Sequence, residues 1–264
     1  MPKPTASNSS AQPLLRKVAY VPGGTGVIGM AVARGLADAG AKVVVGGTDE
    51  GKLRGLTEAI RSSGGEARSV AFDALSVKDI GRSVDAVCDY FGSCDIFVNC
   101  VGIHREQSLL DATEDSYDSV LALNLKAAMF LGQAVARRQV QAAQGGRHVH
   151  MLSVRASLAL QGKGYSAYTS SKGGLAMIVK QHAVELAPHG INVNGVAPTF
   201  VKSEMAQHLL KDPQATAKLL ERIPLGRVAD PEDVVGPTLF FCGPASAFVT
   251  GQILYVDGGL TACQ

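Results

Sequence analysis

The chain has 264 residues, of which 46% are hydrophobic and 18% are charged, and its formal net charge is +2. This balance is typical of a globular protein with buried strands and excludes a disordered or fibrous chain. The net charge is close to zero, and the chain has no tryptophan and no basic runs interleaved with aromatic residues. These features argue against nucleic acid or an anionic membrane as the main partner.

The N-terminal segment Met1 to Pro13 is rich in Pro, Ser, Thr and Asn and lacks an apolar run. It predicts a flexible tail over residues 1–15 rather than a signal peptide. The five cysteines form no C-x-x-C pair, so we expect small core residues in a reducing compartment and no metal site. We expect no segment that is apolar for long enough to span a membrane, and a cytoplasmic protein.

The first strand is predicted at Lys17 to Val21 and the first helix at Met30 to Gly40, with a glycine-rich turn between them. In that turn the pattern Gly24-x-Gly26-x-x-Gly29 lets the backbone approach a pyrophosphate and directs the helix N-terminus at its charge. Because the turn connects a strand to a helix, it predicts dinucleotide binding, although such turns also serve simple β-α connections.

The second strand, Val43 to Val45, is followed by Gly47, Thr48 and Asp49. In a dinucleotide fold a carboxylate at this point selects NAD and an arginine selects NADP. Gly47 and Thr48 are small and neutral, so the choice stays open. Asp49 is better explained as the N-cap of a helix at Glu50 to Ser63 than as a ribose ligand.

A third strand, Arg68 to Ala71, leads to Asp73, which could accept a hydrogen bond from an adenine amino group or cap the helix Val77 to Phe91. The next strand runs from Cys94 to Asn99 and ends near Gly102. Ligands of open α/β sheets bind at the carboxyl ends of the strands, which makes this end a candidate site.

The long helix predicted over Thr113 to Gln144 contains Asn124 within an apolar stretch. A buried asparagine there is either a polar core residue of a bent helix or part of a site. A fifth strand, His148 to Ser153, precedes a helix over Tyr168 to Leu186. Tyr168 and Lys172 lie one turn apart on that helix, and an ammonium beside a phenol would lower the phenol pKa and make it an acid/base group.

The remaining chain contains a strand at Ile191 to Val196, short amphipathic helices over 200–227, a helix start at Asp230-Pro231 and a last strand at Gln252 to Val256. The long connection 199–229 is predicted to be a substrate lid. Strands alternate with helices throughout. We therefore predict an α/β fold of the Rossmann type, with a doubly wound parallel sheet in three α/β/α layers, as a single domain over 16–264.

Taken together, several motifs resemble the short-chain dehydrogenase/reductase family over nearly the whole chain. They are the early glycine turn, Asn99-x-x-Gly102, Asn124, Ser153, Tyr168-x-x-x-Lys172, Asn194-Gly-Val-Ala-Pro198, Ile223-Pro-Leu-Gly-Arg227 and Val256-Asp-Gly-Gly259. The resemblance implies an NAD(P)-dependent enzyme that transfers a hydride between a nicotinamide and a secondary alcohol or carbonyl. It also implies a homotetramer packed through the long helices and the C-terminal strand.

The resemblance assigns catalytic roles residue by residue. Tyr168 would exchange a proton with the substrate oxygen, and Lys172 would lower the pKa of that phenol and bind the nicotinamide ribose. Ser153 would hydrogen-bond the developing alkoxide, with Ser157 as its alternative, and Asn124 would support a water relay to Lys172. The implied cofactor-binding residues are Gly23, Thr25, Gly26, Ile28, Gly29, Thr48, Asp73, Asn99, Gly102, Tyr168, Lys172, Pro198 and Thr199.

The sequence departs from the family pattern at several positions. Pro22 and Val27 replace the usual threonine and glycine of the turn, which brings it closer to the extended relatives such as sugar-nucleotide epimerases. Asn99-Cys100-Val101-Gly102 replaces Asn-Asn-Ala-Gly. Ser153 lies two residues further from Tyr168 than the catalytic serine of the family usually does. Arg155 occupies the position where that serine is most common.

For the substrate, two classes are considered. His104, Arg105, His150, Arg155 and Tyr165 are expected near the carboxyl ends of the strands, and Lys202-Ser-Glu-Met205 resembles the sugar-acid dehydrogenases. Gly102-Ile-His-Arg105 and Ile223-Pro-Leu-Gly-Arg227 resemble 3-oxoacyl-thioester reductases. A sugar acid or polyol is slightly favoured. The rival interpretations are a catalytically silent dinucleotide-binding regulator and an epimerase-type relative.

Overall fold

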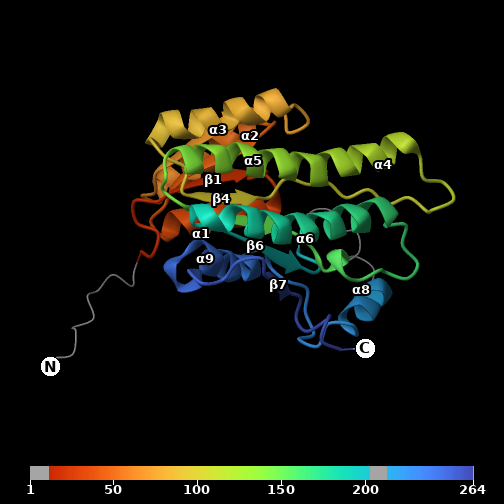
Figure 1. The fold of residues 1–264 in the computed structure, drawn as a ribbon. Coiled ribbons are helices and arrows are strands. Elements are labelled where there is room, and N and C mark those ends of the chain that lie inside the picture. Colours follow the sequence, from red (N-terminus) through yellow and green to blue (C-terminus); the bar gives the residue numbers. More distant parts are fainter. Residues whose placement is uncertain (1–11, 203–212, 264) are drawn as a thin grey trace.

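The computed structural model describes residues 12–202 and 213–263. Its centre is one sheet of seven parallel strands in the order β3-β2-β1-β4-β5-β6-β7 (Figure 1). The strands are β1 (Val18–Pro22), β2 (Lys42–Gly47), β3 (Ala67–Ala71), β4 (Ile96–Asn99), β5 (Gly146–Met151), β6 (Ile191–Pro198) and β7 (Ile253–Val256). The predicted doubly wound Rossmann-type sheet is confirmed.

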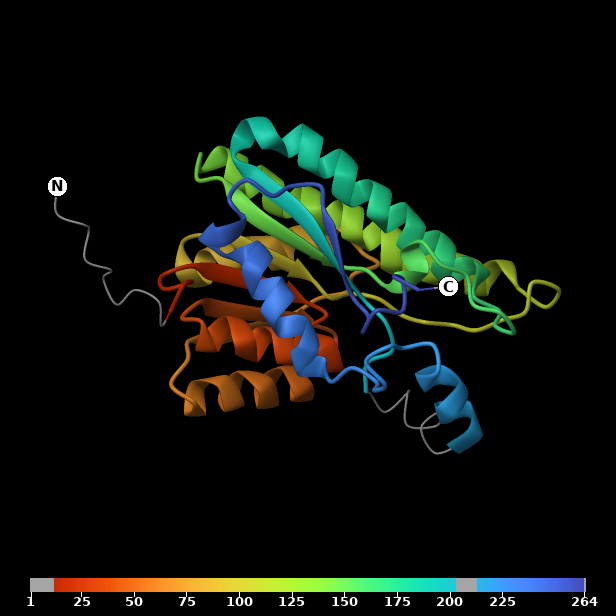
Figure 2. The ribbon, with the colours of Figure 1, turned by 90° about the horizontal axis from the view of Figure 1, so that it is seen from below.

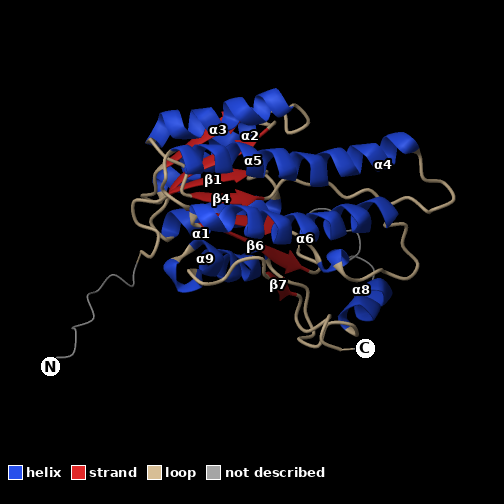
Figure 3. Cartoon of the chain, in the orientation of Figure 1, coloured by secondary structure: helices blue, strands red, loops and turns tan. Residues whose placement is uncertain are grey.

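Helices cover both faces of the sheet (Figures 2 and 3). One layer contains α1 (Val27–Asp38), α2 (Glu50–Ser62) and α9 (Val235–Cys242), and the other contains α3 (Val77–Phe91), α4 (Glu114–Leu121), α5 (Ala127–Gln141) and α6 (Ser166–Leu186). A further helix, α8 (Pro213–Leu220), stands apart from both layers, on the side toward which the strand arrows point in Figure 1.

The two layers follow from the alternation of side chains along the strands. In β1, Ala19 and Val21 pack with α1, α2 and α9, whereas Val18 and Tyr20 pack with α3 and α5. All five residues of β1 are buried, as expected for a central strand of a parallel sheet covered on both faces.

The strand order reverses beside β1, whose neighbours are β2 and β4. The connection after β1 therefore turns toward one layer and the connection after β4 toward the other, which opens a crevice between them. The glycine turn follows β1, and the segment Asn99 to Gly102 follows β4. The fold thus places the two predicted ligand-binding segments side by side.

The long helix differs from its prediction in one respect. It is continuous over Glu114–Gln141, but its middle turn, Ala122–Lys126, is π-helical. By length and composition this helix could cross a membrane, contrary to the sequence-based expectation. It instead packs Ala127, Leu131 and Val135 against the sheet and α3, as core helices of globular proteins do.

Helix starts mostly agree with the sequence. Asp49 caps α2 by accepting a hydrogen bond from the Lys52 amide at 3.0 Å, as predicted. The alternative that Asp73 caps α3 is wrong, because Ser76 does so through the Asp79 amide. Asp73 accepts a hydrogen bond from the Leu75 amide and is exposed.

Two histidines of β5 are fully buried in the core. His148 Nε2 pairs with Gln139 Oε1 at 2.9 Å, and His150 lies edge-on to Phe97. Burial, reinforced by neighbouring histidines, lowers the pKa of His148 to about 3 and the pKa of His150 well below its ordinary value. Both imidazoles are therefore neutral in the folded protein at neutral pH.

These histidines predict an acid-labile fold. Since the unfolded chain binds protons near pH ~6.5 and the folded chain does not, stability is full above that pH and falls as the pH drops below it. Between pH 7.5 and 5.5 we expect a loss of about 1.4 kcal/mol for each of the two. Urea unfolding at both pH values measures this change in the free energy of unfolding. His148→Gln should make the dependence shallower, and exposed His189→Gln should not; equal slopes in all three proteins would contradict the assignment.

Candidate active site

Two positions of the glycine turn, Gly23 and Gly29, have no room for a side chain. Gly23 has φ +76°, and a Cβ there would lie 2.5 Å from the Cys100 carbonyl. A Cβ on Gly29 would lie 2.3 Å from the Gly23 oxygen. These contacts explain why glycine occupies both positions and leave the backbone at the start of α1 open to a ligand.

Asn124 connects three parts of the site. Its Oδ1 accepts from the Ile103 amide at 2.7 Å, and its Nδ2 donates to the Ile103 carbonyl at 2.9 Å and to Ser171 Oγ at 3.0 Å. The π-helical turn projects this fully buried amide out of the helix line. Both open interpretations of Asn124 therefore hold: it is a buried polar residue in a distorted helix, and it fixes the loop after β4 against α6.

Tyr168, Lys172 and Ser153 come together as the sequence predicted. Tyr168 and Lys172 are on α6, and Ser153, which follows β5, lines the same cavity and is close enough to Tyr168 to lower the pKa of its phenol. Lys172 Nζ donates to the Met151 carbonyl at 2.9 Å and lies 5.8 Å from the centroid of the Tyr168 ring. Ser157, the alternative serine, bonds Tyr255 Oη at 2.8 Å instead, so the geometry favours Ser153.

One electrostatic expectation is wrong for the protein without a bound ligand. Burial raises the pKa of the Tyr168 phenol, and this outweighs the hydrogen bond from Ser153 and the charge of Arg155, which lower it. Lys172 is not the neighbour that sets it, because its ammonium bonds the Met151 carbonyl rather than the phenol. Burial lowers the pKa of Lys172 itself to about 8.

A cavity of about 1610 Å³ extends from the glycine turn past Tyr168 to α8. It exceeds the ~300–1000 Å³ typical of a site for one small ligand and has room for a dinucleotide and a second molecule. Among the residues that the structure describes, five cationic side chains and one carboxylate line it: Arg155, Lys163, Lys172, Lys218, Arg222 and Glu106. The cavity is thus suited to anionic ligands.

Most, but not all, of the predicted site residues border this cavity. Those that line it are Gly23, Gly26, Ile28, Gly29, Gly102, Ser153, Tyr168, Lys172, Pro198 and Thr199. Those outside its lining are Thr25, Thr48, Asp73, Asn99 and Asn124. Thr48 and Asp73 are exposed beyond the ends of β2 and β3. Asn99 is buried and bonds the Val101 amide at 3.1 Å, so it shapes the loop from beneath.

The predicted cluster of polar residues for the substrate is only partly correct. His104, Arg155 and Tyr165 line the cavity, with the His104 ring edge-on to Tyr165 at 4.4 Å and to Tyr168 at 4.8 Å. His150 points into the core and Arg105 is exposed outside the lining. Sequence reasoning missed Lys218 and Arg222, because they reach the cavity from α8 and the turn after it, and no local pattern signals that contact.

The segment predicted as a lid is tied together at its two ends. The Lys202 amide donates to the Ala229 carbonyl at 2.8 Å, and the Ala229 amide donates to the Phe200 carbonyl at 3.1 Å. Leu219 and Ile223 pack against Leu260. Residues 203–212, including Glu204 and Met205 of the motif noted above, lie outside the described residues. Closure of this segment over a ligand stays a prediction.

The residues present fit a nicotinamide dinucleotide. Gly26 caps α1 without a side-chain hydrogen bond, so the first amides of the helix remain available for a pyrophosphate. At the other end, Thr199 Oγ1 is buried without a partner among the described residues and could bond a carboxamide. Lys172 and Tyr168 stand between these ends and could hold the nicotinamide ribose.

Comparison with known proteins agrees with this geometry. A family model described as "Enoyl-(Acyl carrier protein) reductase" matches residues 25–261. L-rhamnose 1-dehydrogenase (NAD(P)(+)) of Azotobacter vinelandii is 36% identical over 94% of this chain and 97% of its own length. Gluconate 5-dehydrogenase of Gluconobacter oxydans is 35% identical over 92% of this chain and 94% of its own.

A solved structure extends the likeness to three dimensions. The gluconate 5-dehydrogenase of Burkholderia cenocepacia, crystallised in complex with NADP and tartrate, has a TM-score of 0.92 and 31% identity, covering 98% of this chain and 100% of its own. The similarity spans both halves of the fold, and Gly26, Gly29, Ser153, Tyr168 and Lys172 all lie in the range matched by the family model. The chain therefore belongs to the short-chain dehydrogenase/reductase family and is an NAD(P)-dependent oxidoreductase that transfers a hydride between a nicotinamide and a secondary alcohol or carbonyl.

Proposed function

We propose that this enzyme oxidises a secondary hydroxyl of a sugar acid, and reduces the corresponding ketone, with NAD or NADP. The observation that carries the proposal is the cationic cavity in which Ser153 and Tyr168 are held, with five cations against one carboxylate. Relatives named for gluconate and rhamnose support a polyhydroxylated substrate. A 3-oxoacyl thioester is the second candidate, favoured by the acyl-carrier wording of the family model.

In the proposed mechanism Tyr168 is the group that exchanges a proton with the substrate oxygen. A phenol is protonated at physiological pH, and burial, which raises the pKa of Tyr168, keeps it so; the protein can therefore donate a proton in the reductive direction. The nicotinamide, when bound, supplies or accepts the hydride. Ser153, which lines the cavity with Tyr168, would hold the substrate oxygen beside the phenol.

Lys172 and Asn124 would support this pair in different ways. A Lys172 ammonium adjacent to the bound ribose would favour the phenolate that forms during reduction, and its bond to the Met151 carbonyl fixes its position. Asn124 uses its amide on Ile103 and Ser171, so its role is to position the loop and α6 rather than to contact Lys172 directly. A water relay between Asn124 and Lys172 remains part of the proposal.

The first experiment is binding of NADH and NADPH to the purified protein, followed by nicotinamide fluorescence. The preferred cofactor is then used with D-gluconate, D-sorbitol and a 3-oxoacyl thioester. Oxidation of the acid at a higher kcat/KM than the polyol supports the proposal. Reduction of the thioester alone would favour the second candidate, and cofactor binding without turnover of any of the three compounds would favour a silent dinucleotide-binding regulator.

An epimerase activity is the weaker alternative. Its only support is the glycine pattern with Val27 in place of glycine, a position that lies at the start of α1 and lines the cavity. An epimerase would return the cofactor unchanged, so net formation of NADH or NADPH with a sugar acid would exclude that alternative as the main activity.

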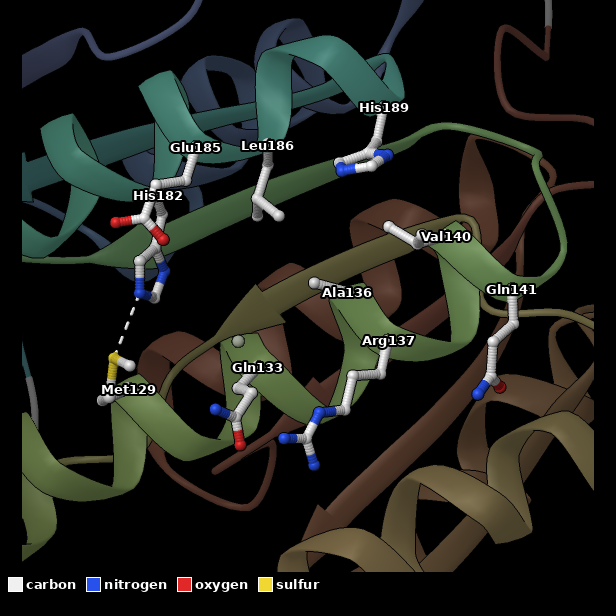
Figure 4. A pocket seen from close by; sticks show the side chains of 11 residues that line it. Met129, Gln133, Ala136, Arg137, Val140, Gln141, His182, Glu185, Leu186 and His189 are labelled. Atoms are coloured by element: carbon white, nitrogen blue, oxygen red, sulfur yellow. Dashed lines mark hydrogen bonds between the residues drawn. The ribbon is translucent and has the colours of Figure 1, made fainter.

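We also propose that the protein is a cytoplasmic homotetramer. A groove of about 340 Å³ lies between α5 and α6. Met129, Ala136 and Val140 of α5 lie on one side of it and His182 and Leu186 of α6 on the other (Figure 4). Beside it α6 exposes Met177 and Val184. An apolar surface of this kind on two long helices favours packing against a second copy. Light scattering with size-exclusion chromatography tests the mass, and a monomer would contradict the proposal.

A further inference from the structure

Arg155 is a buried cation on the wall of the cavity, two residues beyond Ser153. Its side chain is 4% exposed. Nη1 donates to the Ala159 carbonyl at 2.7 Å and to the Leu158 carbonyl at 3.3 Å. Nη2 is equally buried, but it has no hydrogen-bond partner within the described part of the chain. One end of the guanidinium thus holds a loop, and the other end is unused.

An unpaired buried guanidinium is costly, because the charge has left water without gaining a counter-charge. None of the ion pairs between described residues includes Arg155. Burial lowers the pKa of Arg155, and the nearby Arg222 lowers it further. An arginine nevertheless keeps its charge at physiological pH. An anion in the cavity would relieve this cost.

The groups around Arg155 do not supply that anion. Glu106, the carboxylate in the cavity lining, is already paired with Lys163 at 3.1 Å. Tyr165 and His104, which lie nearby, are neutral, because burial raises the pKa of the phenol and lowers the pKa of the imidazole. Their uncharged polar groups are suited to hydroxyls of a ligand rather than to its charge.

We propose that Arg155 binds the carboxylate of the substrate through its free Nη2 and thereby makes the enzyme prefer sugar acids to neutral polyols. The inference rests on the proposed function and names the residue that recognises the acid. Because Arg155 is on the same short turn as Ser153, whose Oγ accepts from its amide at 3.2 Å, the charge and the reacting oxygen are located by one rigid unit. Arg155 would therefore also select which hydroxyl reaches Tyr168.

The test is Arg155→Gln, assayed with D-gluconate and with D-sorbitol, its neutral counterpart. A charge-assisted hydrogen bond of this kind is worth about 30-fold in affinity. We expect kcat/KM for gluconate to fall by about that factor more than kcat/KM for sorbitol, because only gluconate carries the carboxylate. Arg155→Lys, which retains the charge without the fork of donors, should lie between wild type and Arg155→Gln.

Binding provides a second readout that does not depend on turnover. Calorimetric titration of tartrate into the NADPH-loaded protein should show a Kd at least about 10-fold weaker for Arg155→Gln. The matched control is Arg222→Gln, which removes a cavity cation of the same charge from a different segment. If Arg155 acted only through the net charge of the cavity, Arg155→Gln and Arg222→Gln would weaken tartrate binding equally.

The outcomes separate this inference from the proposed function. Equal losses with gluconate and sorbitol would mean that Arg155 merely holds the loop at Leu158 and Ala159, and would overturn the inference. Weaker NADPH affinity with unchanged tartrate affinity would assign Arg155 to the cofactor instead, and would also overturn it. Weaker tartrate binding in an enzyme that oxidises no sugar acid would support Arg155 as an anion site and reject the proposed substrate. Wild-type protein that neither binds tartrate nor oxidises an acid would overturn both.

Discussion

Replacing Tyr168 with phenylalanine should lower kcat by about 10³-fold or more and leave the affinity for NADPH nearly unchanged. Tyr168 lines the cavity together with Ser153, and its ring packs edge-on against His104 at 4.8 Å. Phenylalanine keeps the ring and its packing. Only the proton donor is lost, so the chemical step should fail in a folded protein.

The measurement is steady-state kinetics with the best acid substrate, together with fluorescence titration of NADPH and a thermal melt. Tyr165→Phe is the matched control, because Tyr165 also lines the cavity and packs on His104 at 4.4 Å. We expect that control to retain most of its kcat. Near-normal turnover in Tyr168→Phe, or an equal loss in Tyr165→Phe, would show that Tyr168 is not the proton donor.

Local features of the site could be predicted because they depend on nearest neighbours in the chain. Tyr168 and Lys172 are four residues apart, and a helix places such residues on one face whatever surrounds it. Gly23 and Gly29 follow from a tight turn between a strand and a helix. The side-by-side placement of the β1 and β4 ends follows from the rules of parallel sheets.

Features that depend on contacts across the fold could not be predicted in the same way. Side chains along β5 alternate between the two faces of the sheet, and the ring of His150 points into the core. Which residues of β5 face the core could not be predicted from the sequence alone. The raised pKa of Tyr168 results from burial, which no local spacing reveals. The π-helical turn at Asn124 contains an amide that is bonded to Ile103 and Ser171, in two segments distant along the chain, and local sequence does not reveal such contacts.

Replacing Lys172 with methionine should cause the second largest loss of activity. Unlike Tyr168→Phe, it should also weaken cofactor binding. The variant keeps an unbranched, largely buried side chain but removes the ammonium that donates to the Met151 carbonyl. If that ammonium binds the ribose and favours the phenolate of Tyr168, both cofactor affinity and kcat should fall, with kcat/KM lower by roughly 10²- to 10⁴-fold. Tyr168→Phe, by contrast, should change kcat alone.

The pH dependence of cofactor binding identifies the charge of Lys172 as the cause. Burial lowers the pKa of Lys172 to about 8 in the protein without ligand, so the ammonium is present below that pH and is lost as the pH rises through it. NADPH affinity of the wild type should therefore weaken above pH ~8, and the curve for Lys172→Met should be flat there. A Lys172→Met protein with normal NADPH affinity would restrict the lysine to the proton-transfer step. If NADPH affinity of Lys172→Met still weakened above pH ~8, a group other than Lys172 would be responsible for that titration. Comparing kcat and the NADPH Kd of Lys172→Met with those of Tyr168→Phe would then show which of the two residues acts on the ribose.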